Sequence, residues 1–205
     1  MITFYIKKFL RAPKFIKQQE IAIQKWNNNG KPVPPPREIK QAVVRTTAKK
    51  YKLKTFIETG TFKGQMVYAQ FPFFKKIYSI ELSSELYSRA AKLFSTFPHV
   101  RIIQGDSAVE LKKILTNLHE PALFWLDAHY SEGITAKGDI DTPIKTELKV
   151  ISENPYQHAI LIDDAKDFTG ENGYPAKEEL KKMCSEYFPR HSFSESDNIF
   201  RLLPA

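Results

Sequence analysis

The sequence predicts an α/β protein with a doubly wound, mostly parallel sheet of seven strands, a C-terminal antiparallel hairpin and a basic N-terminal helical arm. From Lys54 onward, short apolar runs alternate with amphipathic stretches, which is typical of parallel strands joined by crossover helices. The last two apolar runs are close enough in sequence to form a hairpin. A chain of 205 residues, of which 42% are hydrophobic, supplies one sizeable core.

The first predicted element is an arm that differs from the rest of the chain in charge. Residues 1–54 hold 14 of the 31 Lys and Arg residues and two acidic residues, so the remainder carries 17 basic and 21 acidic residues. The formal net charge of +8 therefore originates near the N-terminus. Asn27 to Pro36 reads as a Pro-rich linker, and Pro36 can open a helix over Arg37 to Tyr51. We divide the chain into an arm with its linker, residues 1–36, and a main domain, residues 37–205.

Several partners suit the mixed apolar and basic residues of the arm. We favour an arm that packs against the body of the same chain or against a second copy. In the second case, residues 1–26 would form the interface of a homo-oligomer. Peripheral contact with an anionic membrane and binding to RNA are the alternatives. A nucleic acid is disfavoured, because the proline run at Pro34 to Pro36 lacks the context of a base-flipping motif.

The chain shows no signal for export or membrane insertion. Lys and Arg interrupt Met1 to Trp26 every few residues, so neither a transmembrane segment nor a signal peptide is expected. A single cysteine, Cys184, excludes an intramolecular disulfide and fits a reducing compartment. We therefore expect a cytoplasmic protein.

The strands after the arm can be placed from their apolar runs. The five parallel candidates end in, or just before, a polar residue: Thr55 to Glu58, Lys76 to Leu82, Val100 to Gln104, Ala122 to Asp127 and Ala159 to Asp163. The hairpin would join Ser192 to Ser194 and Asn198 to Leu203 through Glu195-Ser196-Asp197. This order predicts a Rossmann-like sheet, in which ligands bind outside the carboxyl ends of the parallel strands.

A glycine-bearing segment follows the first strand, Glu58-Thr59-Gly60-Thr61-Phe62-Lys63-Gly64. It does not match the G-x-G-x-x-G pattern of dinucleotide-binding proteins, which disfavours NAD. The segment resembles the acidic first motif of class I S-adenosylmethionine (SAM)-dependent methyltransferases, and the similarity extends from Lys54 to the C-terminus. Phe62 replaces the middle glycine of the commonest form of that motif. The resemblance implies SAM as cofactor, with Glu58, Gly60, Thr61 and Gly64 contacting it.

Two further strand ends extend the expected cofactor site. Glu81 lies 21 residues after Gly60, a suitable distance for an acid that accepts hydrogen bonds from both ribose hydroxyls. Asp106 and Ser107 follow the third strand and resemble the methyltransferase loop that contacts the adenine. For Ser107 an alternative is open, because Ser107-Ala108-Val109-Glu110 also reads as a capping box for the next helix.

Acidic residues also end the fourth and fifth strands. Asp127, Asp163 and Asp164 would converge if these strands are neighbours, and like charges so close need a proton or a cation between them. Oxygen ligands favour Mg²⁺. The arrangement resembles the metal-dependent macrocin and mycinamicin O-methyltransferases, which implies these three residues as metal ligands. Alternatively, Asp163 or Asp164 caps the next turn and Asp127 contacts the cofactor. Both can ligate only if the chain bends there, since neighbouring strand residues face opposite ways.

The catalytic base is expected beside this cluster. His129 lies two residues after Asp127 and has an ordinary pKa suited to proton removal at neutral pH, although a loop histidine with a structural role is as common. The connection Ala128 to Thr142 is polar and glycine-bearing, so we expect an acceptor pocket or lid there. Thr142-Pro143 would then open a helix, with Thr142 as its capping residue.

These features together predict SAM-dependent O-methylation of a small hydroxylated acceptor, such as a sugar or glycosylated metabolite, with assistance from Mg²⁺. One alternative is a metal-independent methyltransferase with His129 or Asp127 as base. Another is a non-catalytic SAM-binding scaffold whose basic arm binds RNA or anionic lipid.

Overall fold

The computed structural model describes residues 2–127, 143–171 and 173–205. Its helices are α1 (Ile2–Asn28), α2 (Arg37–Lys50), α3 (Gln65–Gln70), α4 (Ser84–Phe94), α5 (Ser107–Thr116), α6 (Ile144–Ser152) and α7 (Lys177–Tyr187). Its strands are β1 (Thr55–Thr59), β2 (Lys76–Glu81), β3 (Val100–Gln104), β4 (Ala122–Leu126), β5 (Ala159–Ile162), β6 (His191–Ser196) and β7 (Ile199–Pro204). Each predicted strand is present, with ends shifted by up to two residues.

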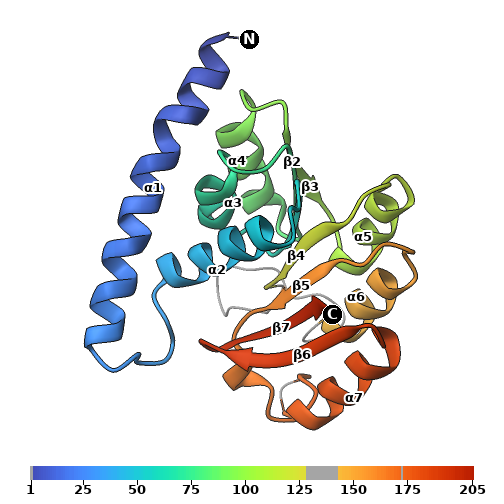
Figure 1. Cartoon of the computed structure of the whole chain (residues 1–205). Helices are drawn as coiled ribbons and strands as arrows, with labels where there is room; N and C mark the ends of the chain where they lie inside the picture. The colour runs from blue at the N-terminus through green and yellow to red at the C-terminus, as the bar shows by residue number, and fades with distance from the viewer. Residues whose placement is uncertain (1, 128–142, 172) are drawn as a thin grey trace.

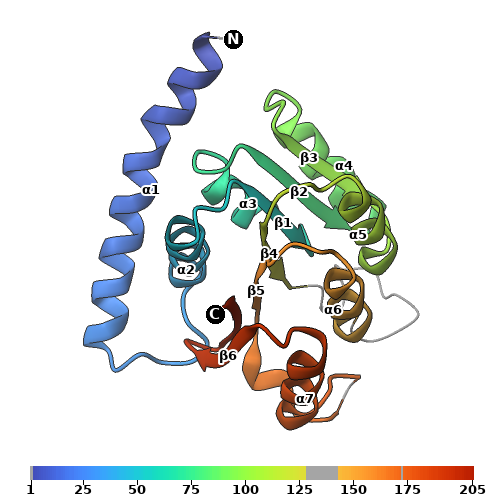
Figure 2. The same ribbon diagram turned by 45° about the vertical axis from the view of Figure 1, so that its right-hand side comes forward.

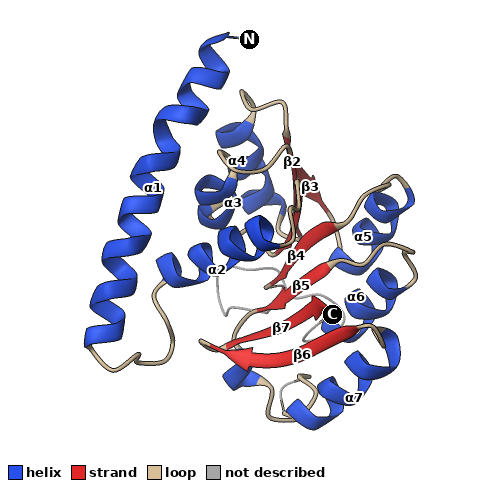
Figure 3. Cartoon of the chain, in the orientation of Figure 1, coloured by secondary structure: helices blue, strands red, loops and turns tan. Residues whose placement is uncertain are grey.

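The strands form one sheet in the order β3-β2-β1-β4-β5-β7-β6 (Figure 3). β1 to β5 pair in parallel, and β7 runs antiparallel to both β5 and β6. The chain reverses direction across the sheet between β1 and β4, which places a topological switch point there. The predicted doubly wound sheet with a C-terminal hairpin is confirmed.

Helices cover both faces of the sheet (Figures 1 and 2). One core contains residues of α2, α3 and α4, with Phe56, Phe71 and Phe74 fully buried, and the other contains residues of α5, α6 and α7. β1 and β4 are buried along their whole length because helices cover them on both sides. The switch point is therefore fixed between two packed layers.

The turn of the C-terminal hairpin is shorter than the sequence analysis predicted. β6 extends to Ser196 and β7 begins at Ile199, so Asp197 and Asn198 alone form the turn, each with a φ of 59°. Two residues with positive φ are typical of a type I′ turn, whose twist matches that of the flanking strands. The expected three-residue separation, Glu195 to Asp197, therefore begins two residues too early and ends one residue too early.

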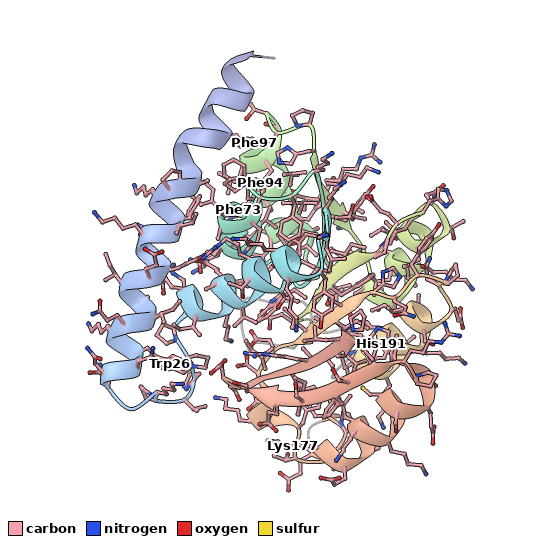
Figure 4. All side chains as sticks on the ribbon, viewed as in Figure 1. Trp26, Phe73, Phe94, Phe97, Lys177 and His191 are labelled. Carbon is pink, nitrogen blue, oxygen red and sulfur yellow. The ribbon has the colours of Figure 1, made fainter. Side chains whose placement is uncertain are left out.

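The arm packs against the body. α1 runs along the outside of α2 in both views, and its N-terminal end extends past the body (Figures 1 and 2). Arg45 of α2 donates to Gln19 at 2.8 Å, and Phe15 packs edge-on against Tyr68. Trp26 is buried near the end of α1, where its indole N–H donates to the carbonyl of Pro32 (Figure 4). Within the described residues, no helix has the length and apolar character to span a membrane.

Candidate functional site

A cavity of about 170 Å³ lies at the carboxyl ends of β1 and β4, at the switch point of the sheet. The glycine-bearing loop Gly60–Gly64 and the first turn of α3 form one wall. The first turn of α2 forms another, with Arg37, Lys40 and Gln41. Asp127 and Asp163 line it from the ends of β4 and β5. The predicted glycine loop and the predicted acidic cluster therefore border one space.

The loop after β1 bends sharply to reach the cavity. Gly60 and Gly64 have φ values of 84° and 69°, and Phe62, between them, has a φ of 48°. Gly64 precedes α3, and a Cβ at this position would lie 2.7 Å from Cε2 of Phe94. Gly64 is thus required by both conformation and packing. Phe62, where the commonest motif has glycine, takes the left-handed conformation that glycine would adopt readily.

Glu58 lies beneath this loop and is 2% exposed. Ser79 of β2 donates to Glu58 Oε2 at 2.5 Å, and the hydroxyl groups of Ser79 and Thr61 lie 2.6 Å apart. Burial raises the pKa of Glu58 well above its ordinary value, against the hydrogen bond from Ser79. The side chains of Glu58 and Thr61 thus brace the loop internally, although both residues border the cavity.

Glu81 ends β2 and holds the same loop from the other side. Its Oε2 accepts from the backbone N–H of Phe62 at 2.7 Å, and its Oε1 accepts from that of Ser83 at 2.9 Å. These bonds fix the carboxylate at the carboxyl edge, and each oxygen retains a second acceptor position. The predicted ribose acceptor is therefore oriented beside the glycine loop.

The capping role at the start of α5 belongs to Asp106 and not to Ser107. Asp106 Oδ1 accepts from the backbone N–H groups of Ala108 and Val109 at 2.8 and 3.3 Å. The capping-box alternative for Ser107 is therefore wrong by one residue. An Asp is as good an N-cap as a Ser, so the two adjacent candidates could not be separated by residue type. Ser107 is the first residue of the helix, and its buried hydroxyl faces Glu147.

Glu147 of α6 is a buried acid that the sequence analysis did not identify. It is 1% exposed and lies beside Ser107 and Thr59, beneath the ends of β1 and β3. Burial raises its pKa to about 7, against hydrogen bonds from Ser107 and Thr59, and the charges of Asp106 and Asp127 add to the increase. Glu147 is therefore a buried acid that titrates near neutral pH at the ends of β1 and β3.

The three predicted metal ligands come together at the ends of β4 and β5. Carboxylate oxygens of Asp127, Asp163 and Asp164 lie within 4.8 Å of one another. The chain bends at Asp164, which has a φ of 50°, so that adjacent aspartates face the same space. Asp163 Oδ1 accepts from the backbone N–H of Asp164 at 2.8 Å, a bond of the kind that the capping alternative expected. The side chain of Asp164 makes no capping bond to the turn that follows it.

Lys40 of α2 completes this cluster and was missed by the sequence analysis. Its Nζ donates to Asp163 Oδ2 at 2.6 Å and to Asp164 Oδ1 at 3.2 Å. Burial lowers the pKa of Lys40, but the attraction of Asp163, Asp164 and Asp127 outweighs it, so the pKa lies above its ordinary value. Burial, the largest cause, and the charges of Asp127 and Asp164 raise the pKa of Asp163, and the ion pair with Lys40 opposes this increase only in part.

His129, the predicted general base, lies outside the described residues, as does the expected acceptor loop Ala128 to Thr142. The structure does describe Pro143, which immediately precedes α6. The expected capping residue Thr142 is also outside the described part.

Comparison with solved structures identifies the fold that carries this site. A methyltransferase from Podospora anserina with bound S-adenosylhomocysteine (SAH) is 17% identical, with a TM-score of 0.57, 93% of this chain and 87% of that chain being covered. An O-methyltransferase from Bacillus cereus in complex with SAH is 12% identical, with a TM-score of 0.58 and coverages of 91% and 90%. The chain has the fold of the class I SAM-dependent methyltransferases.

The methyltransferase fold is shared with proteins of different acceptor chemistry. The N-methyltransferase NodS from Bradyrhizobium japonicum, in complex with SAH, is 13% identical, with a TM-score of 0.55 and coverages of 88% and 97%. No family model matches the sequence. A search of curated proteins also finds no match. The comparisons therefore establish the fold, and the acceptor has to be argued from the site.

Proposed function

We propose that the chain binds SAM against the loop Gly60–Gly64 and transfers its methyl group to a hydroxyl group of a small acceptor. The observation that carries this proposal is the shared cavity, which the glycine loop borders on one side and Asp127, Asp163 and Lys40 border on the other. A methyl donor on the loop would thus face charged groups able to orient a hydroxyl and accept its proton. SAH-bound structures of the same fold support SAM as the cofactor.

Glu81, Asp106 and Ser107 complete the proposed cofactor site. Glu81 would accept hydrogen bonds from the ribose through the acceptor positions that Phe62 and Ser83 leave open. Asp106, whose capping bonds both go to Oδ1, would contact the adenine edge through Oδ2. Glu81 ends β2 and Asp106 follows β3, so both lie at the carboxyl edge of the sheet, on the same side of β1.

Methyl transfer is an in-line displacement in which an acceptor oxygen forms a bond to the methyl carbon as the bond from that carbon to sulfur breaks. The acceptor loses its proton to a base, for which Asp127 and His129 are the candidates, and the cofactor leaves as SAH. The protein chiefly positions the acceptor and removes the proton.

The fit of Mg²⁺ to the cluster depends on Lys40. Three carboxylates are suitable ligands for Mg²⁺, which would act as a Lewis acid on the acceptor hydroxyl. Lys40 Nζ already bonds two of these carboxylates, at 2.6 and 3.2 Å. A metal would therefore bind only after Lys40 moves away, so no step of the proposed reaction is assigned to it.

Calorimetric titration with SAM, and with NAD as comparison, tests the proposal without knowledge of the acceptor. We expect SAM to bind and NAD not to bind. Glu81→Ala should weaken SAM binding by about tenfold or more, since each charge-assisted hydrogen bond contributes roughly 1.5 to 3 kcal/mol. Glu85→Ala, which removes an exposed carboxylate four residues away, is the matched control. Unchanged SAM affinity in a folded Glu81→Ala variant would reject the assigned ribose contact.

A further inference from the structure

The position of Lys40 has a consequence for the metal requirement of the cluster. Lys40 lies in the first turn of α2, and its side chain is 17% exposed, whereas that of Asp163 is 3% exposed. An ammonium group this close to a buried carboxylate forms a strong, charge-assisted bond, and either charge alone would be costly to bury. The pair therefore depends on both members.

Other groups fix the carboxylates around the ammonium. Asp164 donates its backbone N–H to Asp163 Oδ1, which leaves Oδ2 to accept from Lys40. Asp164 Oδ1 accepts from both Asn198 Nδ2, at 3.0 Å, and Lys40 Nζ, at 3.2 Å. Asn198 is held in turn by the tight hairpin between β6 and β7. Elements from opposite ends of the chain thus arrange two aspartates around one lysine.

We propose that Lys40 is the resident cation of the Asp127–Asp163–Asp164 cluster, so that the cluster holds together without a divalent metal and acquires a metal site when Lys40 is removed. The catalytic consequence rests on the proposed function. Because Lys40 lines the cavity, its ammonium would then donate to the acceptor oxygen and stabilise the negative charge that develops there.

The proposal is tested by measuring Mn²⁺ binding to the full chain by electron paramagnetic resonance. Lys40→Met keeps the length and apolar character of the stem and removes the charge that pairs with Asp163 and Asp164. We expect this variant to bind Mn²⁺ about a hundredfold more tightly than the unmodified chain. Asp164→Asn in the Lys40→Met background should abolish the gain.

Two controls separate this effect from a general change of charge. Lys40→Arg retains a cation beside Asp163 and should not gain Mn²⁺ affinity. Lys177, the first residue of α7, pairs with Glu195 of β6 at 2.7 Å (Figure 4). Lys177→Met removes this distant lysine and should bind Mn²⁺ as weakly as the unmodified chain. Equal Mn²⁺ affinity in the unmodified chain and Lys40→Met, whether tight or undetectable, would overturn the proposal.

A second measurement keeps the proposal testable if Lys40→Met does not fold. The thermal midpoint of the unmodified chain should be the same in MgCl₂ and in KCl of equal ionic strength, since Lys40 excludes the metal. A higher midpoint specific to Mg²⁺ that is lost in Asp164→Asn would overturn it. SAM titration of the same samples separates this proposal from the proposed function, because SAM affinity and Mn²⁺ affinity are measured independently. If SAM binds but Lys40→Met gains no Mn²⁺ affinity, only the proposal on Lys40 is contradicted. If SAM does not bind, the proposed function is contradicted and the comparison of Mn²⁺ affinities still tests the role of Lys40.

Discussion

Replacing Glu147 with Gln tests how a buried acid beneath the ends of β1 and β3 sets the pH dependence of stability. Burial raises the pKa of Glu147 from 4.5 to about 7. The folded chain thus binds this proton more tightly than the unfolded chain, so the contribution to stability is complete below about pH 4.5 and is lost as the pH rises through about 7. The difference corresponds to about 3 kcal/mol at full effect. Gln resembles the protonated acid and does not titrate, so Glu147→Gln should lose less stability on going to alkaline pH.

Urea denaturation at several pH values between about 5 and 8 measures this difference. The free energy of unfolding of the unmodified chain should fall relative to that of Glu147→Gln, by up to about 3 kcal/mol across the range. Groups that titrate in both proteins, Asp163 among them, cancel in the comparison. Glu153→Gln, at an exposed position just after the same helix, should follow the unmodified chain. Parallel profiles for the unmodified chain and Glu147→Gln would refute the assigned pKa.

Three other outcomes are expected. Gly64→Ala should lower the free energy of unfolding by about 1 to 3 kcal/mol, because a Cβ would contact Phe94 at 2.7 Å; Gly30→Ala, with a φ of +76° and nothing within 4 Å, measures the conformational strain alone in the same urea experiment. Burial lowers the pKa of His158 from 6.5 to about 4, so stability should fall as the pH drops through this range, and calorimetric scans should show a smaller fall in His158→Gln. A chain beginning at Arg37 should still bind SAM, with any change of oligomeric state visible by light scattering; a folded but non-binding truncated chain would place the arm in the site.

The central strands were predictable because β1, β4 and β5 are buried on both faces, and β4 and β5 form continuous apolar runs in the sequence. All five residues of β4, Ala122–Leu126, are buried, and they stand out in the sequence without any periodicity. The hairpin turn was misplaced because it is marked by residue types that tolerate positive φ and not by the ends of the apolar runs. Asp197 and Asn198 belong to the few residue types that tolerate positive φ, and that preference marks the turn better than the boundaries of the apolar runs.

The acidic residues of the site were predictable for a related reason, since a polar residue after an apolar strand must lie at the carboxyl edge of the sheet. The convergence of Asp163 and Asp164 required a bend, and the φ of 50° at Asp164 supplies it. Lys40 could not be predicted in the same way. It is one of five basic residues in α2, and only the packing of that helix against β4 and β5 selects it over the others.

The carboxyl groups at the carboxyl edge of the sheet differ in how much negative charge they present. This difference affects how the site would bind a positively charged methyl donor. Burial raises the pKa values of Glu58 and Glu147, which shifts each acid toward its neutral form and reduces the negative charge that it adds. Asp163 is paired with Lys40, which offsets part of the negative charge at the ends of β4 and β5. SAM brings one positive charge that disappears when the methyl group leaves, and the proton released by the acceptor needs a carboxylate to receive it. Uncompensated carboxylates at this edge would attract the sulfonium group of SAM and bind it tightly before transfer. The same attraction would disfavour the transition state, in which the sulfonium charge is being lost. Buried acids with raised pKa values and a fixed ammonium reduce that opposition, since they lower the uncompensated negative charge at this edge.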